Sequence, residues 1–353
     1  MQWLNVLCLL AVLGTALPSV DSHWTVTKDE RLALIRRAQV WRATDVANMD
    51  LRTGPDGSGA FQPDELVTCD YRPRPLHGSS RKFYCALPDG DIVKVRYGPH
   101  NREVQGSVLA TRLLWALGFV ADRVYPVRVS CRGCSADPWK NQATQKGTHE
   151  FDPAVIERKP HGHEVWEGND KADWAWSELD DVDANVGGAA IGQRDALKLL
   201  ATFMQHTDTK SKQQRLLCVS PEGPAKGTCD QPFLFLHDVG LTFGRANALN
   251  RASVGSVNLE EWANTPIWKD RAACIAHLSK SNTGTLSNPP ISEAGRQFLA
   301  DRLIQLTDRQ VRDLFEVAQV ASVDDWIAAF KQKRDDIVTH HCAPAPRLAI
   351  AIR

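Results

Sequence analysis

Strand-like and helix-like patterns occupy different halves of this chain, and this separation is what most constrains its fold. Between about residues 66 and 132 apolar and polar residues alternate in short runs, such as DIVKVRY at residues 91–97. One strong helical pattern, NREVQGSVLATRLLWALGF at residues 101–119, interrupts these runs. From residue 191 onward the patterns are mainly helical. A β-rich half followed by a helical half predicts an α+β fold with two lobes and a cleft between them.

The same patterns predict five segments along the chain. Residues 1–22 are expected to be a signal peptide, 23–60 an N-terminal helical extension, 61–135 the β-rich N-lobe, 136–190 a hinge or insertion, and 191–345 the helical C-lobe. The hinge segment contains one strand-like run, AVIERK, and otherwise shows no clean period. Three helical patterns close the C-lobe: SEAGRQFLADRLIQL, TDRQVRDLFEVAQV and VDDWIAAFKQKRDDIVTHH.

The beginning of the chain resembles an export signal. An apolar core runs from Trp3 to about Leu17 and is followed by small and polar residues, with cleavage expected near Ser22. The apolar run is shorter than the roughly 20 residues of a membrane span. We therefore expect a secreted or periplasmic protein with no stable membrane span after removal of the signal. An uncleaved N-terminal anchor is the alternative.

The cysteines support an oxidising environment. The chain has nine, and removal of the signal would take Cys8 and leave eight, an even number suited to disulfides. A zinc site is the alternative, but CRGC is the sole CxxC motif in the sequence. Local spacing predicts the pairs Cys69 with Cys85, Cys131 with Cys134 and Cys218 with Cys229, which leaves Cys274 with Cys342.

The overall charge gives no indication of a nucleic-acid or membrane-surface partner. Forty-two basic residues balance forty-two acidic ones, so no excess of positive charge exists to attract polyanions. We expect no nucleic-acid partner, and any ligand must be inferred from a site.

Two charged residues in the β-rich half fit a phosphate-binding role. Lys94 lies inside an apolar strand pattern, where an ammonium group needs a partner or a ligand. Glu103 follows nine residues later at the start of the predicted helix, and we expect it to pair with Lys94 and hold it towards a nucleotide. The alternatives are that Lys94 and Arg96 both face solvent, and that Glu103 only complements the helix dipole.

The loop HTDTKSKQ at residues 206–213 supplies further polar groups. Asp208 is placed to accept a proton from a substrate hydroxyl, Lys210 to steady a transferring phosphoryl group, and Gln213 to reach a metal ion. The spacing matches HRDxKxxN with glutamine in place of asparagine. A polar turn after a helix is the alternative.

A carboxylate follows the apolar run FLFLH. Asp238 stands directly after this predicted strand and is followed by Val239 and Gly240. A carboxylate at the end of a buried strand is well placed to hold a hard cation over a cleft. The alternative is a strand that ends in an ordinary Asp turn.

Lys94, Glu103, the loop at residues 206–213 and Asp238 follow one another in the order that protein kinases show. The chain therefore resembles a member of the protein-kinase-like superfamily, within an exported bacterial-type branch. The chain is similar to secreted-pathway and phosphatidylinositol-kinase-like branches in its altered motifs. The resemblance covers roughly residues 66–245 and implies a two-lobed protein-kinase-like fold with ATP and Mg²⁺, or Mn²⁺, in the cleft. It also implies that Gly78, Ser79 and Ser80 cover the nucleotide, although no complete GxGxxG motif is present.

The sequence therefore predicts an exported ATP- and Mg²⁺-dependent phosphotransferase. Its hydroxyl acceptor is not specified, because protein, sugar and small-molecule kinases share these residues. The alternative is a disulfide-stabilised secreted pseudokinase that binds a nucleotide or a partner without catalysis, since ATP is scarce outside the cytoplasm. A zinc site at His161 and His163, or at His340 and His341, lacks a convincing third ligand.

Overall fold

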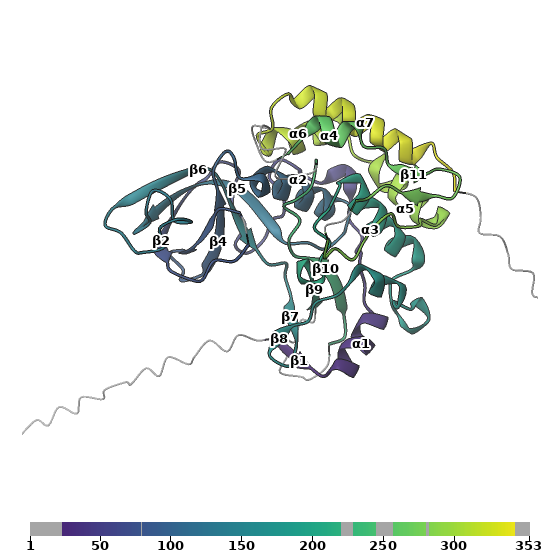
Figure 1. The fold of residues 1–353 in the computed structure, drawn as a ribbon, viewed down its shortest axis with the longest axis horizontal. Helices are drawn as coiled ribbons and strands as arrows, with labels where there is room; N and C mark the ends of the chain where they lie inside the picture. Colours follow the sequence, from purple (N-terminus) through teal and green to yellow (C-terminus); the bar gives the residue numbers. More distant parts are fainter. Residues whose placement is uncertain (1–22, 79, 220–228, 245–256, 280–281, 343–353) are drawn as a thin grey trace, which may run out of the picture.

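The computed structural model describes residues 23–78, 80–219, 229–244, 257–279 and 282–342. The fold is mixed α and β, with a β-barrel at one end and a larger, mainly helical part at the other (Figure 1). Within the described ranges, none of the helices has the length and apolar character needed to cross a bilayer. The predicted signal peptide lies outside these ranges.

Five strands close the barrel in the order β2-β3-β4-β6-β5. The alternating sequence of β4 explains its two faces: Val93 and Val95 pack in the barrel core, while Lys94 and Arg96 project from the opposite face. The barrel strands are β2 (Leu66–Arg72), β3 (Lys82–Ala86), β4 (Ile92–Tyr97), β5 (Arg123–Arg132) and β6 (Thr148–Arg158).

Strand β6 corrects the predicted domain boundary at residue 135. It pairs antiparallel with both β4 and β5 and so completes the barrel, although sequence analysis placed it in a hinge or insertion. Its first half, THEFDP, contains charged residues and Pro153, which hide the alternation expected of a strand. The run AVIERK, predicted as a strand, forms its second half up to Arg158.

Helix α2 (Arg102–Ala116) packs against the barrel strand β5. Asn101 caps it, because its side-chain oxygen accepts a hydrogen bond from the backbone of Glu103. Glycines allow another segment to approach α2 closely: a Cβ on Gly106 would lie 2.3 Å from the carbonyl oxygen of Gly240, and a Cβ on Gly240 would lie 2.7 Å from Cβ of Glu103. The residues after β10 therefore rest on the first turn of α2.

The larger part contains a second sheet with the strand order β1-β7-β9-β10, and β8 pairs with β7 at its side. Strands β9 and β10 form an antiparallel hairpin, and the cysteines that flank its loop, Cys218 and Cys229, are bonded. The strands are β1 (Trp24–Val26), β7 (His163–Glu167), β8 (Asp170–Lys171), β9 (Gln214–Cys218) and β10 (Pro232–Leu236).

Helices enclose the core of the larger part. Phe203, Trp262, Phe315 and Trp326 pack there in an aromatic cluster. The three helices predicted at the end of the chain are confirmed as α5, α6 and α7. A small sheet of β11 (Trp268–Asp270) and β12 (Ile275–Ala276) lies beside them. Besides α2, the α-helices of the described residues are α1 (Lys28–Arg36), α3 (Ile191–Phe203), α4 (Leu259–Asn264), α5 (Glu293–Leu303), α6 (Asp308–Val317) and α7 (Val323–Val338).

The predicted helical extension at residues 23–60 is largely wrong. Helix α1 and a single 3₁₀ turn at Val46–Asn48 are its helical parts, and β1 pairs in parallel with β7. After α1 the chain runs extended because Gln39 exchanges backbone hydrogen bonds with the Pro232 and Leu234 region of β10. Tertiary pairing thus overrides the helical pattern, and the segment belongs to the core of the larger part.

The four predicted disulfides are confirmed. Their Cα–Cα distances lie between 5.6 and 5.7 Å, within the range that a disulfide spans. His161 and His163 join no three-ligand group within the described ranges. The bonded pairs are Cys69–Cys85, Cys131–Cys134, Cys218–Cys229 and Cys274–Cys342.

Candidate functional site

A polar cavity of about 500 Å³ opens where the barrel meets the second sheet. Barrel strands β3, β4 and β6 contribute one wall, and Lys171 of β8 and His237, directly after β10, contribute the other. Positive charge dominates: among the described lining residues, two are acidic, Asp91 and Glu157. Six are basic: Arg74, Lys94, Arg123, Arg158, Lys159 and Lys171.

Strand register aligns three of these lining residues. Tyr84 on β3 lies opposite Lys94 on β4, which in turn lies opposite Glu157 on β6. Lys94 Nζ lies 2.5 Å from Glu157 Oε1. The predicted pair between Lys94 and Glu103 is therefore wrong, because the neighbouring strand offers Lys94 a nearer carboxylate.

Arg96, two residues after Lys94 on the same face of β4, is the partner of Glu103. Its side chain is almost fully buried and contacts three carboxylates. Arg96 Nε lies 2.9 Å from Glu103 Oε2, Nη2 lies 3.1 Å from Asp238 Oδ2, and Nη1 contacts Glu157. One guanidinium thus ties the barrel and α2 to the segment after β10.

The predicted nucleotide-covering loop is only partly connected to this cluster. Ser80 is buried, and its hydroxyl donates a 2.7 Å hydrogen bond to Glu103 Oε2. Gly78 is exposed and has a φ of +87°, a conformation that favours glycine. Ser79 lies outside the described residues.

The β9–β10 hairpin brings the loop at residues 206–213 next to Asp238. Leu236 pairs with Gln214, so Gln213 lies across from His237 at the open end of the hairpin. The carbonyl oxygen of Gln213 accepts hydrogen bonds from the backbone N–H of His237 at 2.9 Å and of Asp238 at 3.4 Å. Two motifs about thirty residues apart in sequence are joined by main-chain hydrogen bonds.

Two neighbours hold the carboxylate of Asp208 on either side. Lys210 Nζ lies 2.9 Å from Oδ1, and Gln213 Nε2 donates a 3.0 Å hydrogen bond to Oδ2. His206 is fully buried against Trp176. Burial lowers its pKa to about 4, although the charges of Asp208 and Asp238 oppose that shift, so the imidazole is neutral at pH 7.

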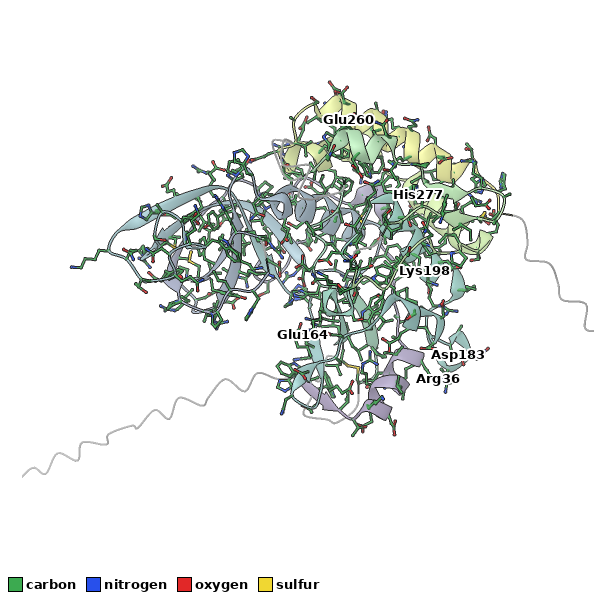
Figure 2. The ribbon with its side chains drawn as sticks, viewed as in Figure 1. Arg36, Glu164, Asp183, Lys198, Glu260 and His277 are labelled. Carbon is green, nitrogen blue, oxygen red and sulfur yellow. A yellow bond between two sulfur atoms is a disulfide. The ribbon has the colours of Figure 1, made fainter. Side chains whose placement is uncertain are left out.

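A second network on the cavity wall was missed by sequence analysis. Lys159 Nζ lies 2.5 Å from His237 Nδ1 and 3.4 Å from Asp122 Oδ1, and Asp122 is buried. Glu164, labelled on β7 in Figure 2, accepts a hydrogen bond from Lys171. These residues come from separate segments of the chain, and no local pattern in the sequence links them.

Asp238 and Glu157 are ionised in the folded protein. Burial opposes ionisation of Asp238, but Arg96 and then Lys94 outweigh it and lower its pKa to about 2. Burial likewise opposes ionisation of Glu157, and the same two cations hold its pKa well below the usual range. The folded protein is therefore stabilised when the carboxylates of Asp238 and Glu157 are charged.

We expect stability to fall as the pH drops from about 4 towards 2. Carboxyl groups of the unfolded chain titrate near pH 4, whereas folded Asp238 titrates at about 2. The stabilisation is therefore complete above the unfolded pKa and is lost as the pH falls through the folded pKa. Urea unfolding across this interval measures the loss. Asp238→Asn removes this carboxyl and should make the pH dependence shallower, and identical profiles for the variant and the wild type would contradict this account.

Similarity to known proteins is found at the level of structure. No protein-family model matches the chain, and no curated protein matches its sequence. The structure is similar to that of the proinflammatory kinase CtkA of Helicobacter pylori, with 11% sequence identity, a TM-score of 0.42, and coverage of 79% of this chain and 95% of that chain. This degree of similarity provides no correspondence between residues.

Proposed function

We propose that the protein is an exported, ATP- and Mg²⁺-dependent phosphotransferase with a two-lobed protein-kinase-like fold. One observation carries the proposal: a cavity with six basic lining residues also includes His237, the neighbour of Asp238 in sequence, and a main-chain hydrogen bond joins Asp238 to Gln213, whose amide contacts Asp208. Excess positive charge suits the phosphates of a nucleotide. Carboxylate and amide oxygens suit a hard cation.

The residues of the site have different roles in the proposed reaction. Asp208 accepts the proton of the attacking hydroxyl, and Lys210, 2.9 Å from it, stabilises negative charge on the phosphoryl group in transit. Lys94 binds phosphate oxygens from the barrel side. Glu103 acts through Arg96 instead of through Lys94, so Arg96 and Glu103 are positioning residues that fix Asp238 against the barrel.

The donor set fits Mg²⁺ or Mn²⁺. Asp238 remains ionised at neutral pH; Arg96 contacts its Oδ2, and its Oδ1 accepts a 3.4 Å hydrogen bond from the backbone N–H of Gly240. Gln213 approaches from the adjacent loop with an amide oxygen, a ligand type that hard cations accept. When bound, the metal ion would neutralise charge on the nucleotide phosphates.

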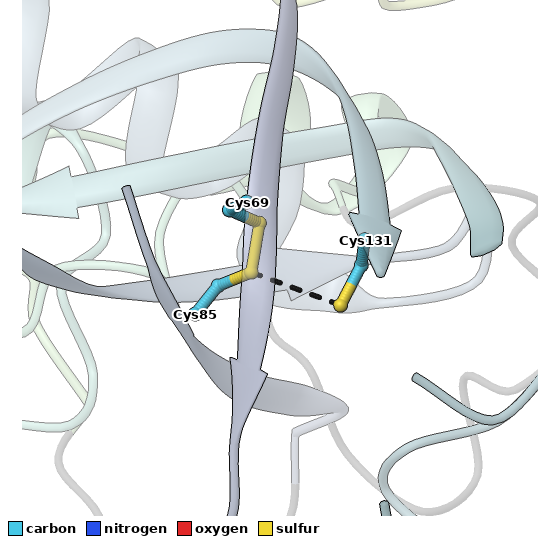
Figure 3. Close-up of side chains that lie close together, drawn as sticks. All are labelled: Cys69, Cys85 and Cys131. Carbon is cyan, nitrogen blue, oxygen red and sulfur yellow. Dashed lines mark hydrogen bonds between the residues drawn. A yellow bond between two sulfur atoms is a disulfide. The ribbon is translucent and has the colours of Figure 1, made fainter. Parts of the chain in front are cut away.

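The disulfides support the proposal of export. Four bonded pairs within the described residues are typical of secreted or periplasmic proteins. Figure 3 shows the bond between Cys69 and Cys85 with the sulfur of Cys131 beside it. The acceptor hydroxyl belongs to a protein, a sugar or a small molecule, and the cavity offers basic groups to any of these.

A pseudokinase is the second candidate, and one feature favours it. Both carboxylates already have cationic partners, Asp208 with Lys210 and Asp238 with Arg96. A protein that only binds a nucleotide or a partner needs no free base, so neutralised carboxylates suit it as well.

Titration with ATP and Mg²⁺ tests the proposal. Ligand at about 100 times its Kd stabilises the folded protein by about 2.7 kcal/mol, which should raise the Tm by a few degrees. Lys94→Met should reduce this rise, whereas Lys331→Met, which removes a lysine paired with Asp308 away from the cavity, should leave it unchanged.

Phosphate turnover then separates the two candidates. A Tm rise with autophosphorylation or γ-phosphate release supports the phosphotransferase. A Tm rise without turnover supports the pseudokinase. The absence of any Tm rise with Mg²⁺-ATP would contradict the phosphotransferase and a nucleotide-binding pseudokinase, and would leave a pseudokinase that binds only a partner.

A further inference from the structure

A second cavity, of about 400 Å³, lies where the connection between β6 and β7 meets the end of α2 and strand β10. Lys159 in this connection lines the nucleotide cavity, whereas the next two residues, Pro160 and His161, line the second cavity. Its volume falls within the range of about 300–1,000 Å³ that is common for small-molecule sites. The second cavity is therefore large enough for a ligand of its own.

Aromatic side chains give the second cavity an apolar floor. Phe119, shortly after α2, and Phe233 on β10 are buried, and Trp115 on α2 is partly buried. Gly118 lets another segment approach this floor, because its φ is +89° and a Cβ there would lie 2.2 Å from the carbonyl oxygen of Arg42. The backbone N–H of Arg42 donates a 2.9 Å hydrogen bond to the carbonyl oxygen of Gly118. The turn after α2 thus places an arginine beside three aromatic rings.

Three basic residues line the second cavity and lack a carboxylate partner. Arg42, Arg123 and His161 form no ion pair with any residue of the described ranges. Arg123 donates hydrogen bonds to the carbonyl oxygens of Lys159 and Ser58, both at 3.1 Å. These neutral acceptors leave the charge of its guanidinium uncompensated.

The acidic residues of the second cavity do not cancel this charge. Asp122 is buried and already contacts Lys159, so Asp56 is the remaining acidic group among the described lining residues. Burial lowers the pKa of His161, and the charges of the two arginines lower it further while Asp56 opposes them. At neutral pH two arginines therefore face one uncompensated aspartate, an excess of one positive charge that suits a monoanion.

We propose that the second cavity binds a small aromatic carboxylate, with its ring on Phe119 and Phe233 and its carboxylate against Arg42 and Arg123. Aromatic rings favour offset or edge contacts with another ring. A planar guanidinium presents its N–H groups in the geometry of a carboxylate. The proposal is independent of the proposed phosphotransferase activity.

Two probes of the same shape test the proposal on the full-length wild-type protein. Isothermal titration calorimetry compares 2-naphthoate with 2-naphthamide, which has the same rings and a neutral amide. We expect one naphthoate per chain and an affinity at least about tenfold higher than that of naphthamide, the scale of a charge-assisted hydrogen bond. This comparison needs no substitution, so it does not depend on the stability of a variant.

Substitution of Arg42 then locates the site. Arg42 is exposed, so Arg42→Gln should keep the urea midpoint while it weakens naphthoate binding by about tenfold and leaves naphthamide binding unchanged. Arg42→Lys should bind naphthoate more tightly than Arg42→Gln. The matched control is Arg309→Gln, which removes an exposed arginine paired with Asp313 elsewhere on the surface. Lys94→Met, in the nucleotide cavity, should also leave naphthoate binding unchanged.

Three results would overturn the proposal. The first is naphthoate that shows no saturable binding, or that binds no more tightly than naphthamide. The second is an affinity for naphthoate that Arg42→Gln does not change. The third is an equal loss of affinity in Lys94→Met and Arg42→Gln, which would place the probe in the nucleotide cavity.

Discussion

Arg96→Met is expected to lower the free energy of unfolding at pH 7 by about 3–5 kcal/mol, the scale for breaking a buried ion pair from one side. The substitution keeps much of the side-chain volume but removes the charge shared by Glu103, Glu157 and Asp238. Lys94 still faces Glu157, so the largest cost comes from Glu103 and Asp238. Urea unfolding measures the difference.

A surface arginine provides the matched control. Arg312 also contacts two carboxylates, Glu316 and Asp324, but its side chain is about half exposed. Arg312→Met should cost less than about 1 kcal/mol, because solvent screens exposed pairs. Equal losses for Arg96→Met and Arg312→Met would show that the buried cluster does not stabilise the fold as we describe. Arg96→Lys should recover only part of the loss, since a single ammonium cannot contact three carboxylates at once.

Asp238→Asn is expected to reduce metal-dependent phosphate turnover by at least about 10²–10³-fold, the scale for loss of one electrostatic group in an active site. Asparagine has nearly the same shape, but it lacks the negative charge that a metal ion requires. The fold should persist because Arg96 keeps Glu103 and Glu157 as partners. Turnover of γ-phosphate, measured beside the urea midpoint, separates lost chemistry from lost structure.

The control for this variant is an aspartate of similar chemistry outside the site. Asp308 is exposed and pairs with Lys331 on the surface. Asp308→Asn should leave turnover unchanged. Turnover that survives Asp238→Asn would remove Asp238 from the proposed metal site.

Local patterns predicted much of the fold. The alternation in β4 and the helical periods of α2, α5, α6 and α7 were sufficient because each element buries one side of a regular pattern. The disulfides followed from the spacing of nearby cysteines, which left Cys274 and Cys342 as the remaining pair. The loop at residues 206–213 lies beside Asp238 because the β9–β10 hairpin brings the two segments together.

Long-range pairing defeated the other predictions. Lys94 forms an ion pair with Glu157, sixty-three residues later, because β4 and β6 are neighbours in the barrel. No local pattern in the sequence encodes this contact. Arg96 then becomes the partner of Glu103. The sequence places Arg96 two residues after Lys94, on the same face of the strand. It does not show whether this arginine is solvated or paired with carboxylates, because its burial depends on distant segments. The extended chain around Gln39 was likewise set by pairing with β10.

The most direct test is a crystal structure of the protein with Mg²⁺ and a non-hydrolysable ATP analogue. The account predicts that phosphates lie against Lys94 in the basic cavity, next to His237, with the metal ion on Asp238 and Gln213. Density for the analogue at another surface, or a cavity that stays empty at saturating analogue and Mg²⁺, would contradict it.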